Sequence, residues 1–373
     1  MQAAEVSDRR SSAALAAWAH RPGDETFTTV EEVLKHTAEV RTQSSVSDAA
    51  VEHLGVMTPG DSLDPGADQL YLVKGDKAAR FTNHAFNQFC QAIGARAGEW
   101  RKYPAALAQV PLTWKAENSD RKDVKLLTRV DENKQFECRA VNSPTYGRIW
   151  NYELAEAVHK YVDPGIWAVP SYERTFHTNT GFISTNDRKV FIFLVNEGKP
   201  IELPGTDSPL YRGFYAWNSE VGDGTCGIAE FLFNKVCANR AMLGLTGFQE
   251  LCIRHTSGAP DRWVKDAVPS LKEYMDASTK QVVRRIVDAK EKNVAKDEKG
   301  AAEWLQARGF TKALAKATIE SAREEERGAD PKYSPFSVWN LIQGATAEAR
   351  EKRNNDDRVA LEVQAGRLMK AAF

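Results

Sequence analysis

The fold is decided by two alternating segments, Asp123-Val-Lys-Leu-Leu-Thr-Arg129 and Gln135-Phe-Glu-Cys-Arg-Ala-Val-Asn142. Apolar and polar residues alternate along both segments, which is typical of strands with one buried face. The polar run Asp131-Glu-Asn-Lys134 separates them by the length of a turn. The stretch therefore predicts a β-hairpin, and the other elements can be placed relative to it.

A helix and further strands follow the hairpin. Leu154, Val158 and Tyr161 recur at helical spacing, and Pro164-Gly165 ends that helix. Strands are then predicted at Thr180 to Ser184, Lys189 to Asn196, Tyr211 to Ser219, Cys226 to Val236 and Leu251 to His255. We therefore predict an α+β core at 121–257, with a mainly antiparallel sheet that carries the helix on one face and has the hairpin as its edge or as an arm.

Three other regions surround this core. Residues 1–68 are expected to form a partly ordered leader with little core, in which Thr28 or Thr29 caps a short helix. Residues 69–120 predict a small helical unit, and residues 258–373 predict a helical C-terminal region. In the last region an apolar stripe suggests self-association into a homo-oligomer. Its residues are Val264, Leu271, Met275, Val282 and Ile286.

Composition excludes several classes of function. The formal net charge is -1, and residues 121–256 carry 16 Lys plus Arg and 16 Asp plus Glu, so nucleic-acid binding requires a local basic patch. No apolar run approaches the roughly 20 residues of a membrane span, and no secretory signal precedes the core, so a cytoplasmic location in a bacterial host is expected. The sequence contains no G-x-x-x-x-G-K-S/T phosphate-binding loop and no G-x-S-x-G nucleophile elbow, which argues against an enzyme of these classes.

Three segments are distinctive: Arg139-Ala-Val-Asn-Ser-Pro-Thr-Tyr-Gly-Arg148, Tyr215-Ala-Trp-Asn-Ser-Glu-Val-Gly222, and Cys237-Ala-Asn-Arg240 with Ile253-Arg254-His255-Thr256. Their order and spacing resemble the phage- and plasmid-borne proteins catalogued as domain of unknown function 932, over about Leu70 to Leu271. The resemblance implies a protein of a mobile element and gives no catalytic residue. Some members of that family have been suspected of a distant relationship to phage single-strand annealing recombinases, whose core is a hairpin, a helix and an antiparallel sheet.

The candidate site gathers cationic and aromatic residues from these segments. Guanidinium groups pair with phosphate, and aromatic rings stack on bases. We expect eight residues to line one groove for single-stranded nucleic acid: Arg139, Tyr146, Arg148, Trp217, Lys235, Arg240, Arg254 and His255.

Alternative interpretations stay open at each of these motifs. Arg139 to Trp150 also suits a Ser-Pro turn with its aromatic rings packed inward, and Arg254 to Thr256 suits a sheet edge. Glu220 and Asp223 could hold Mg²⁺, although a hairpin turn explains them without a cofactor. Cys237 with His255 suits a thiol nucleophile only if a third group is supplied.

The sequence thus favours a nucleic-acid-binding protein of a phage or plasmid, such as a single-strand annealing or recombination factor that oligomerises. The alternative is a phage assembly or anti-defence interaction protein without catalytic activity.

Overall fold

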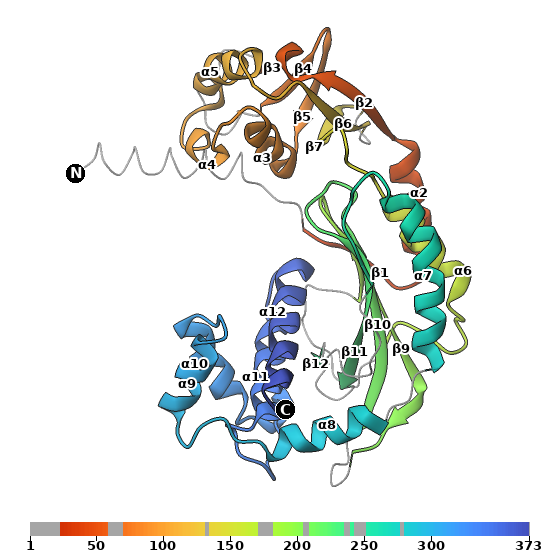
Figure 1. Ribbon diagram of the computed structural model, residues 1–373, viewed down its shortest axis with the longest axis vertical. Helices are drawn as coiled ribbons and strands as arrows, with labels where there is room; N and C mark the ends of the chain where they lie inside the picture. Colours follow the sequence, from red (N-terminus) through yellow and green to blue (C-terminus); the bar gives the residue numbers. More distant parts are fainter. Residues whose placement is uncertain are drawn as a thin grey trace, which may run out of the picture.

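The structure is a computed structural model that describes residues 23–58, 70–130, 134–170, 182–203, 209–234, 239–241, 251–276 and 280–372. These residues form two curved sheets and several helices, arranged as a crescent (Figure 1). The expected α+β class is confirmed. The strands lie in two sheets, however, and the predicted hairpin belongs to a different sheet from the strands that follow it.

The hairpin sheet, at one end of the crescent, has the strand order β2-β6-β7-β5-β4-β3. Its strands are β2 (Ser44–Ala50), β3 (Leu54–Met57), β4 (Tyr71–Lys74), β5 (Lys77–Phe81), β6 (Asp123–Val130) and β7 (Phe136–Asn142). Strands β6 and β7 form the predicted hairpin, with Leu126 opposite Val141. Neighbouring strands are antiparallel except β5 and β7, which run parallel.

Three helices belong to the hairpin sheet: α3 (Asn83–Ala92), α4 (Ala97–Trp100) and α5 (Ala105–Glu117). Phe86, Phe89 and Leu112 join the same apolar core as Leu126 and Val141. The region expected to be a separate helical unit therefore shares one core with the hairpin, because β4 and β5 precede its helices and pair within the same sheet.

The central sheet has the strand order β1-β8-β9-β10-β11-β12, and β13 also pairs with β11. Its strands are β1 (Glu25–Phe27), β8 (Ile183–Thr185), β9 (Val190–Ile201), β10 (Leu210–Asn218), β11 (Cys226–Asn234), β12 (Asn239–Ala241) and β13 (Leu251–Ile253). All of its pairings are antiparallel. Alternation along β9 gives each face a core: Ile192 points into one apolar cluster, and Phe193 points into another.

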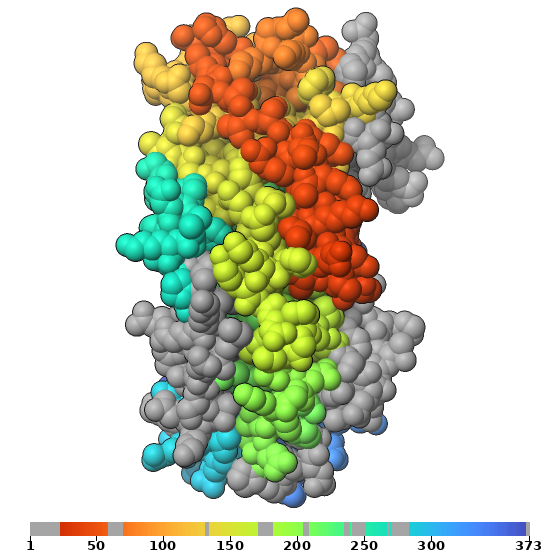
Figure 2. Space-filling model, turned by 90° about the vertical axis from the view of Figure 1, so that its right-hand side faces the viewer, coloured from red at the N-terminus to blue at the C-terminus, as the bar shows by residue number. Residues whose placement is uncertain are grey.

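The convex face of the central sheet carries α2 (Val30–Thr42), α6 (Asn151–Tyr161) and α7 (Ala259–Asp276). Figure 2 shows α2 in red, α6 in yellow-green and α7 in teal across this face. Leu154 and Val158 of α6 are fully buried against strands β9 and β10. The predicted packing of this helix on one face of the sheet is therefore confirmed.

The helical C-terminal region, also confirmed, contains α8 (Lys280–Glu291), α9 (Glu298–Gln306), α10 (Lys312–Ser321), α11 (Val338–Arg350) and α12 (Asn355–Arg367). Helices α11 and α12 lie inside the crescent (Figure 1). Val359 of α12 packs on the aromatic cluster of the central sheet, which includes Phe193, Phe231 and Phe233. Short 3-10 turns occur at Val51–His53, Glu325–Arg327 and Leu368–Ala372.

Two sequence expectations need correction. Residues 23–58 were expected to belong to a leader that contributes little to the core. Instead they form β1, α2, β2 and β3, and Val33 and Val51 are fully buried. Thr29 does cap the helix, but the helix is 13 residues long. In the C-terminal stripe Ile286 is buried in the protein's own core while Val264 is exposed, and the side chains of the other three residues lie outside the description.

None of the described helices is sufficiently long and apolar to cross a lipid bilayer.

Candidate functional site

Parts of the three distinctive segments meet where the two sheets join: Arg139 to Arg148, Ser219 to Gly222 and His255 to Thr256. The loop after β10, residues 219–225, contacts β7 and α3 of the hairpin sheet on one side and the start of α6 on the other. Segments about 80 residues apart in the sequence, around Arg139 and Glu220, thereby come into contact. We call this set of buried polar contacts the joint network.

Glu220 lies at the centre of the joint network. Its carboxylate forms an ion pair with Arg139 through one oxygen, and the other accepts the backbone N–H of Asn151 at 3.0 Å. Burial alone would raise the pKa of Glu220, but the Arg139 guanidinium and the Asn151 N–H outweigh it, so the pKa lies below the usual value. Arg139 and Glu220 are both buried, and each neutralises the other's charge. The Arg139 guanidinium, expected to contact phosphate, is therefore not accessible to solvent.

Arg148 and Tyr146 hold the backbone of the same loop. Arg148 donates to the carbonyl oxygen of Glu220 and, at 2.8 Å, to Oδ1 of Asn142. The Tyr146 hydroxyl donates to the carbonyl oxygen of Ser219 at 3.0 Å, and burial raises the pKa of this hydroxyl. The guanidinium of Arg148 lies 5.1 Å from the Tyr146 ring. Both side chains therefore serve internal contacts that a nucleic acid would have to replace.

His255 packs beside Tyr146. The two rings stack with centroids 5.1 Å apart, and the ring nitrogen Nδ1 lies 3.1 Å from the carbonyl oxygen of Gly147. The N–H of Gly147 in turn donates to the carbonyl oxygen of His255 at 3.2 Å. Burial lowers the pKa of His255 to about 4, so the imidazole is neutral at pH 7.

Helix α3 reaches the joint network through the carbonyl oxygen of Val221. This oxygen accepts Nε2 of Gln88 at 2.9 Å and Nδ2 of Asn142 at 3.0 Å, and Nε2 of His84 lies 3.3 Å away. Gly222 follows with a φ of 87°, in the left-handed region that favours glycine. These contacts fix the loop to the hairpin sheet, and the predicted turn at Asn218 to Gly224 is confirmed.

The two carboxylates considered for Mg²⁺ serve different partners. Glu220 faces Arg139, whereas Asp223 lies 3.3 Å from Nζ of Lys189 and 3.5 Å from Nδ1 of His84. Across the described ranges, no group of three or more His, Cys, Asp or Glu side chains is placed to hold a metal ion. The loop is therefore an ion-paired turn and does not form the two-carboxylate site that the sequence suggested.

Among the described cysteines, Cys90 and Cys138 are buried. Burial raises the pKa of Cys90 and of Cys138 to about 12, so both thiols stay protonated at neutral pH. Cys237, the thiol considered with His255, lies outside the described residues. The neutral, hydrogen-bonded His255 is oriented by Gly147 and Tyr146.

Arg240 belongs to a second buried cluster, inside the crescent. Its Nε donates to Glu362 of α12 at 2.8 Å, and both side chains are fully buried. Arg358 donates to the same Glu362 oxygen at 2.8 Å. The Arg240 guanidinium lies 3.8 Å from the Phe193 ring centroid, so this residue ties α12 to the central sheet.

The other three candidate residues are placed differently. Trp217 is half-buried, stacks on Tyr215 with centroids 4.9 Å apart, and donates from Nε1 to Thr225 at 3.2 Å. Arg254 is exposed, and Lys235 lies outside the described residues. Arg139, Tyr146, Arg148 and His255 thus come together, as expected, but in a buried network, while Arg240 lies in a separate cluster.

Sequence reasoning missed two partners in the joint network and misassigned a third. Asn142 and Gln88 belong to a strand and a helix face whose local patterns do not indicate these hydrogen bonds. Glu220 was considered as a Mg²⁺ ligand, whereas it pairs with Arg139 and accepts the Asn151 N–H. A buried pair between Arg139 and Glu220 has no signature in spacing, because 81 residues separate the two.

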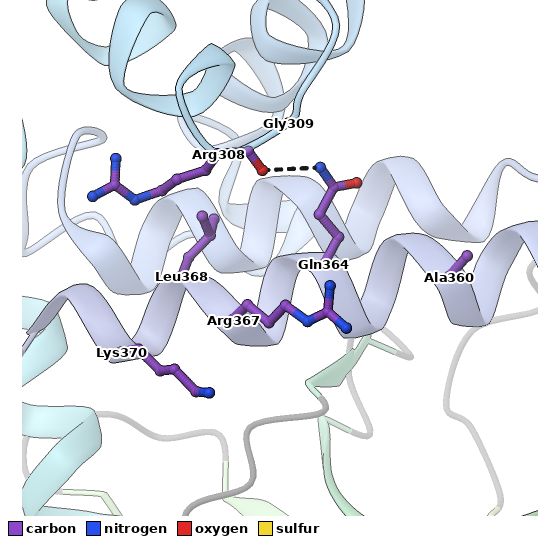
Figure 3. Close-up of a pocket in the computed structure, with 7 residues that line it drawn as sticks. All are labelled: Arg308, Gly309, Ala360, Gln364, Arg367, Leu368 and Lys370. Carbon is purple, nitrogen blue, oxygen red and sulfur yellow. Dashed lines mark hydrogen bonds between the residues drawn. The ribbon is translucent and has the colours of Figure 1, made fainter. Parts of the chain in front are cut away.

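Among the described residues, pockets occur beside the joint network and at the C-terminal helices. A pocket of about 220 Å³ lies beside the joint network and is lined by both acids and cations, among them Arg80, Glu137 and Asp187. A larger pocket of about 540 Å³ opens between the α9–α10 turn and α12 (Figure 3). Its lining residues are Arg308, Gly309, Ala360, Gln364, Arg367, Leu368 and Lys370, and none of them is acidic.

Comparisons of the chain with known protein families, with curated proteins and with solved structures find no match.

Proposed function

We propose that the chain is a non-catalytic, nucleic-acid-binding protein of a mobile element, which holds single strands through its C-terminal helical region. The observation that carries the proposal is the 540 Å³ pocket, whose three charged residues, Arg308, Arg367 and Lys370, are all cations. Phosphate groups favour such a site because paired N–H donors and positive charge act together there.

The cations of this pocket differ in how they are held. Arg308 lies with its guanidinium 3.8 Å from the Trp304 ring and donates to the Trp304 carbonyl oxygen at 3.0 Å. Gln364 donates to the Arg308 carbonyl oxygen at 3.3 Å, which fixes the turn against α12 (Figure 3). Arg367 and Lys370 are exposed and form no ion pair with any described residue. Their charge is therefore available to an anionic partner.

Charge distribution supports the same region. From Lys280 to Ala372 the sequence holds 19 Lys plus Arg and 15 Asp plus Glu, although the whole chain has a formal net charge of -1. The C-terminal region thus has a net positive charge, and the rest of the chain has a net negative charge. This difference would direct a polyanion toward the C-terminal region.

The resemblance to the phage and plasmid family supports the choice of partner. The order of β6–β7 hairpin, helix α6 and antiparallel strands β8 to β11 is the order that the suspected relationship to annealing recombinases implies. The order of elements along the chain is therefore the expected one. The hairpin, however, pairs within the neighbouring sheet and not with strands β8 to β11. Among the described cations that the sequence assigned to the groove, Arg254 has an exposed side chain.

The test is binding of a single-stranded DNA of roughly 40 to 60 nucleotides, measured at several salt concentrations by gel shift. The plot of log K against log salt has a negative slope. Replacing Arg308, Arg367 and Lys370 together with Gln should make this slope shallower by about 2, since each lost phosphate contact on a single strand contributes about 0.7. The matched control replaces three exposed arginines elsewhere, Arg96, Arg121 and Arg262, with Gln.

Binding that is equally weakened in both triple variants would locate the contact elsewhere and contradict the proposed site. Absence of binding at low salt would contradict the function itself. The second candidate, an assembly protein without a nucleic-acid partner, would then lead, and it is favoured by the exposed apolar face of helix α5.

A further inference from the structure

The pocket of about 220 Å³ beside the joint network lies between the two sheets. Arg80, Arg129 and Glu137 line it from strands β5, β6 and β7 of the hairpin sheet, and Thr185 and Asp187 line it from the end of β8 and the turn after it. Helix α2, on the outer rim of the crescent (Figure 1), supplies a third wall. Small ligands commonly bind at such junctions, because several elements can contact one molecule there.

The walls of this pocket are polar. Val40 is the one apolar side chain among the described residues that line it. Five of these residues are buried, and all five are polar or charged: Thr37, Arg139, Asn151, Thr185 and Asn186. The volume also lies below the roughly 300 Å³ at which pockets for drug-sized ligands begin. The pocket therefore suits a small polar molecule and not an apolar one.

The hairpin-sheet wall carries one more cation than it has acids to match. Arg80 pairs with Glu137 at 3.0 Å, and Arg139 pairs with Glu220. Arg129 forms no ion pair with a described residue, and its Nε donates to a glutamine side chain at 3.2 Å. Its other N–H groups can bind a carboxylate, since guanidinium and carboxylate form paired hydrogen bonds. The anionic end of a ligand therefore fits this wall.

The central-sheet wall has the opposite charge. Its acid is Asp187, whose side chain is 7% exposed and lies 3.7 Å from Nε of Arg188, a separation longer than a hydrogen bond. Water screens a buried charge less than an exposed one, so this carboxylate attracts a cationic group strongly. Glu25, by contrast, is 64% exposed and lies 3.5 Å from Nδ1 of His36, so solvent weakens its attraction. The cationic end of a ligand therefore fits beside Asp187.

We propose that this pocket binds a small zwitterion, whose carboxylate pairs with Arg129 and whose ammonium group pairs with Asp187. The two residues lie on elements of different sheets, so the bound ligand bridges the sheets beside the joint network. A polyanion is disfavoured, because its other charges would meet Asp187 and Glu137. The pocket shares no lining residue with the C-terminal pocket, so this ligand is distinct from the proposed nucleic-acid partner.

Ligand-observed NMR titrations of the full chain with β-alanine, 4-aminobutyrate and 6-aminohexanoate test the proposal, because these zwitterions differ in the separation of their charges. Each is compared with the acid and the amine of the same chain length, such as butyrate and butylamine for 4-aminobutyrate. At least one zwitterion should bind about tenfold more tightly than its acid and its amine, as expected for one further charge-assisted hydrogen bond.

Two substitutions separate the ends of the ligand. Asp187→Asn should lower the affinity for the zwitterion about tenfold without lowering the affinity for the acid, which has no group to pair with Asp187. Arg129→Gln should weaken the zwitterion to a similar extent without lowering the affinity for the amine. The matched controls are Asp120→Asn and Arg121→Gln, at exposed positions outside the pocket, and neither should change any affinity.

The proposal is wrong if no zwitterion binds more tightly than its acid and its amine. An acid that binds as tightly as the zwitterion would indicate a simple anion site and would also overturn it. The same holds if the Asp187→Asn and Arg129→Gln variants both bind the zwitterion like the wild type. Urea unfolding shows whether each variant is folded, and should Asp187→Asn fail to fold, Arg129→Gln at a half-buried position decides between these outcomes.

Discussion

At Gly147 the joint network leaves no room for a side chain. A Cβ atom at this position would overlap the backbone carbonyl of Thr256, because the 146–148 and 254–256 segments exchange hydrogen bonds at this point. The contact is with backbone, so no rotamer change can relieve it. The sequence suggests a Ser-Pro turn in this segment, and the structure explains the glycine at 147 by the close approach of a second segment.

Gly147→Ala should therefore lower the free energy of unfolding by on the order of 3 kcal/mol, as expected for overpacking against backbone. Gly98→Ala is the matched control, since a Cβ there meets nothing within 4 Å and the residue lies in helix α4. Urea unfolding followed by circular dichroism measures both variants. Equal stabilities for the two variants would show that the segments separate at little cost.

His255 makes stability depend on pH. Its folded pKa is about 4, below the usual value of 6.5, because burial disfavours the charged imidazole. Between pH 6.5 and pH 4 the unfolded chain binds a proton that the folded chain does not, so the free energy of unfolding falls as the pH falls through this window. The loss contributed by His255 should be on the order of 2 kcal/mol after allowance for partial exposure.

Unfolding titrations at pH 7 and pH 4.5 on the wild type and on His255→Gln measure this effect. The variant should lose less stability between the two pH values, while some dependence remains because burial also lowers the pKa of His84. His53→Gln serves as control, as His53 is an exposed histidine. An identical pH dependence in wild type and His255→Gln would refute the assignment.

At the scale of elements, prediction from sequence succeeds where a pattern is long. The hairpin, helix α6 and strands β9 to β11 have lengths of 7 to 12 residues, and their apolar periodicity identifies them. The three- to five-residue strands β1, β3, β4 and β5 have too few residues for a period to be recognised. Their existence depends on pairing with distant strands, as when Glu25 lies opposite Thr185.

The candidate site shows the same limit. The residue types in the distinctive segments identified Arg139, Arg148 and His255 as candidate site residues. The fold does bring these three residues together. Whether a guanidinium faces solvent or a carboxylate is decided by packing across the two sheets, which no local pattern encodes. The basic pocket was missed for another reason: Arg308 in the turn after α9 and Arg367 at the end of α12 belong to charged segments that individually look like solvated surface.

On the scale of the whole molecule, the C-terminal helices complete the central sheet. Phe193, Phe231 and Phe233 on its inner face pack with Val359 of α12, and Arg240 pairs with Glu362 of the same helix. The sheet therefore has an apolar inner face that depends on residues more than a hundred positions later in the sequence. The C-terminal region is part of the fold as well as the proposed binding region.

A chain truncated after Thr256 should accordingly be insoluble or bind a hydrophobic dye strongly, because the aromatic face and the unpaired charge of Arg240 would be uncovered. The measurement is the soluble fraction on expression, followed by dye fluorescence on any soluble material. A truncated chain that is soluble, dye-free and cooperative in urea unfolding would show that the central sheet needs no C-terminal cover.

The link between Asp24 and α12 has a consequence for synthesis of the chain. The Asp24 carboxylate accepts the backbone N–H of Asn355 at 2.6 Å, across 331 positions of sequence, and also accepts Asn186 at 2.8 Å. At a translation rate of about 5 to 20 residues per second, Asp24 emerges roughly 20 to 70 seconds before its partner exists. The last aromatic residue of the inner face, Phe233, is translated 126 residues before Val359 of α12, so this face has no helix to cover it for about 6 to 25 seconds. We therefore expect the nascent chain to bind holding chaperones until α12 has been translated, and slower translation to lengthen this period.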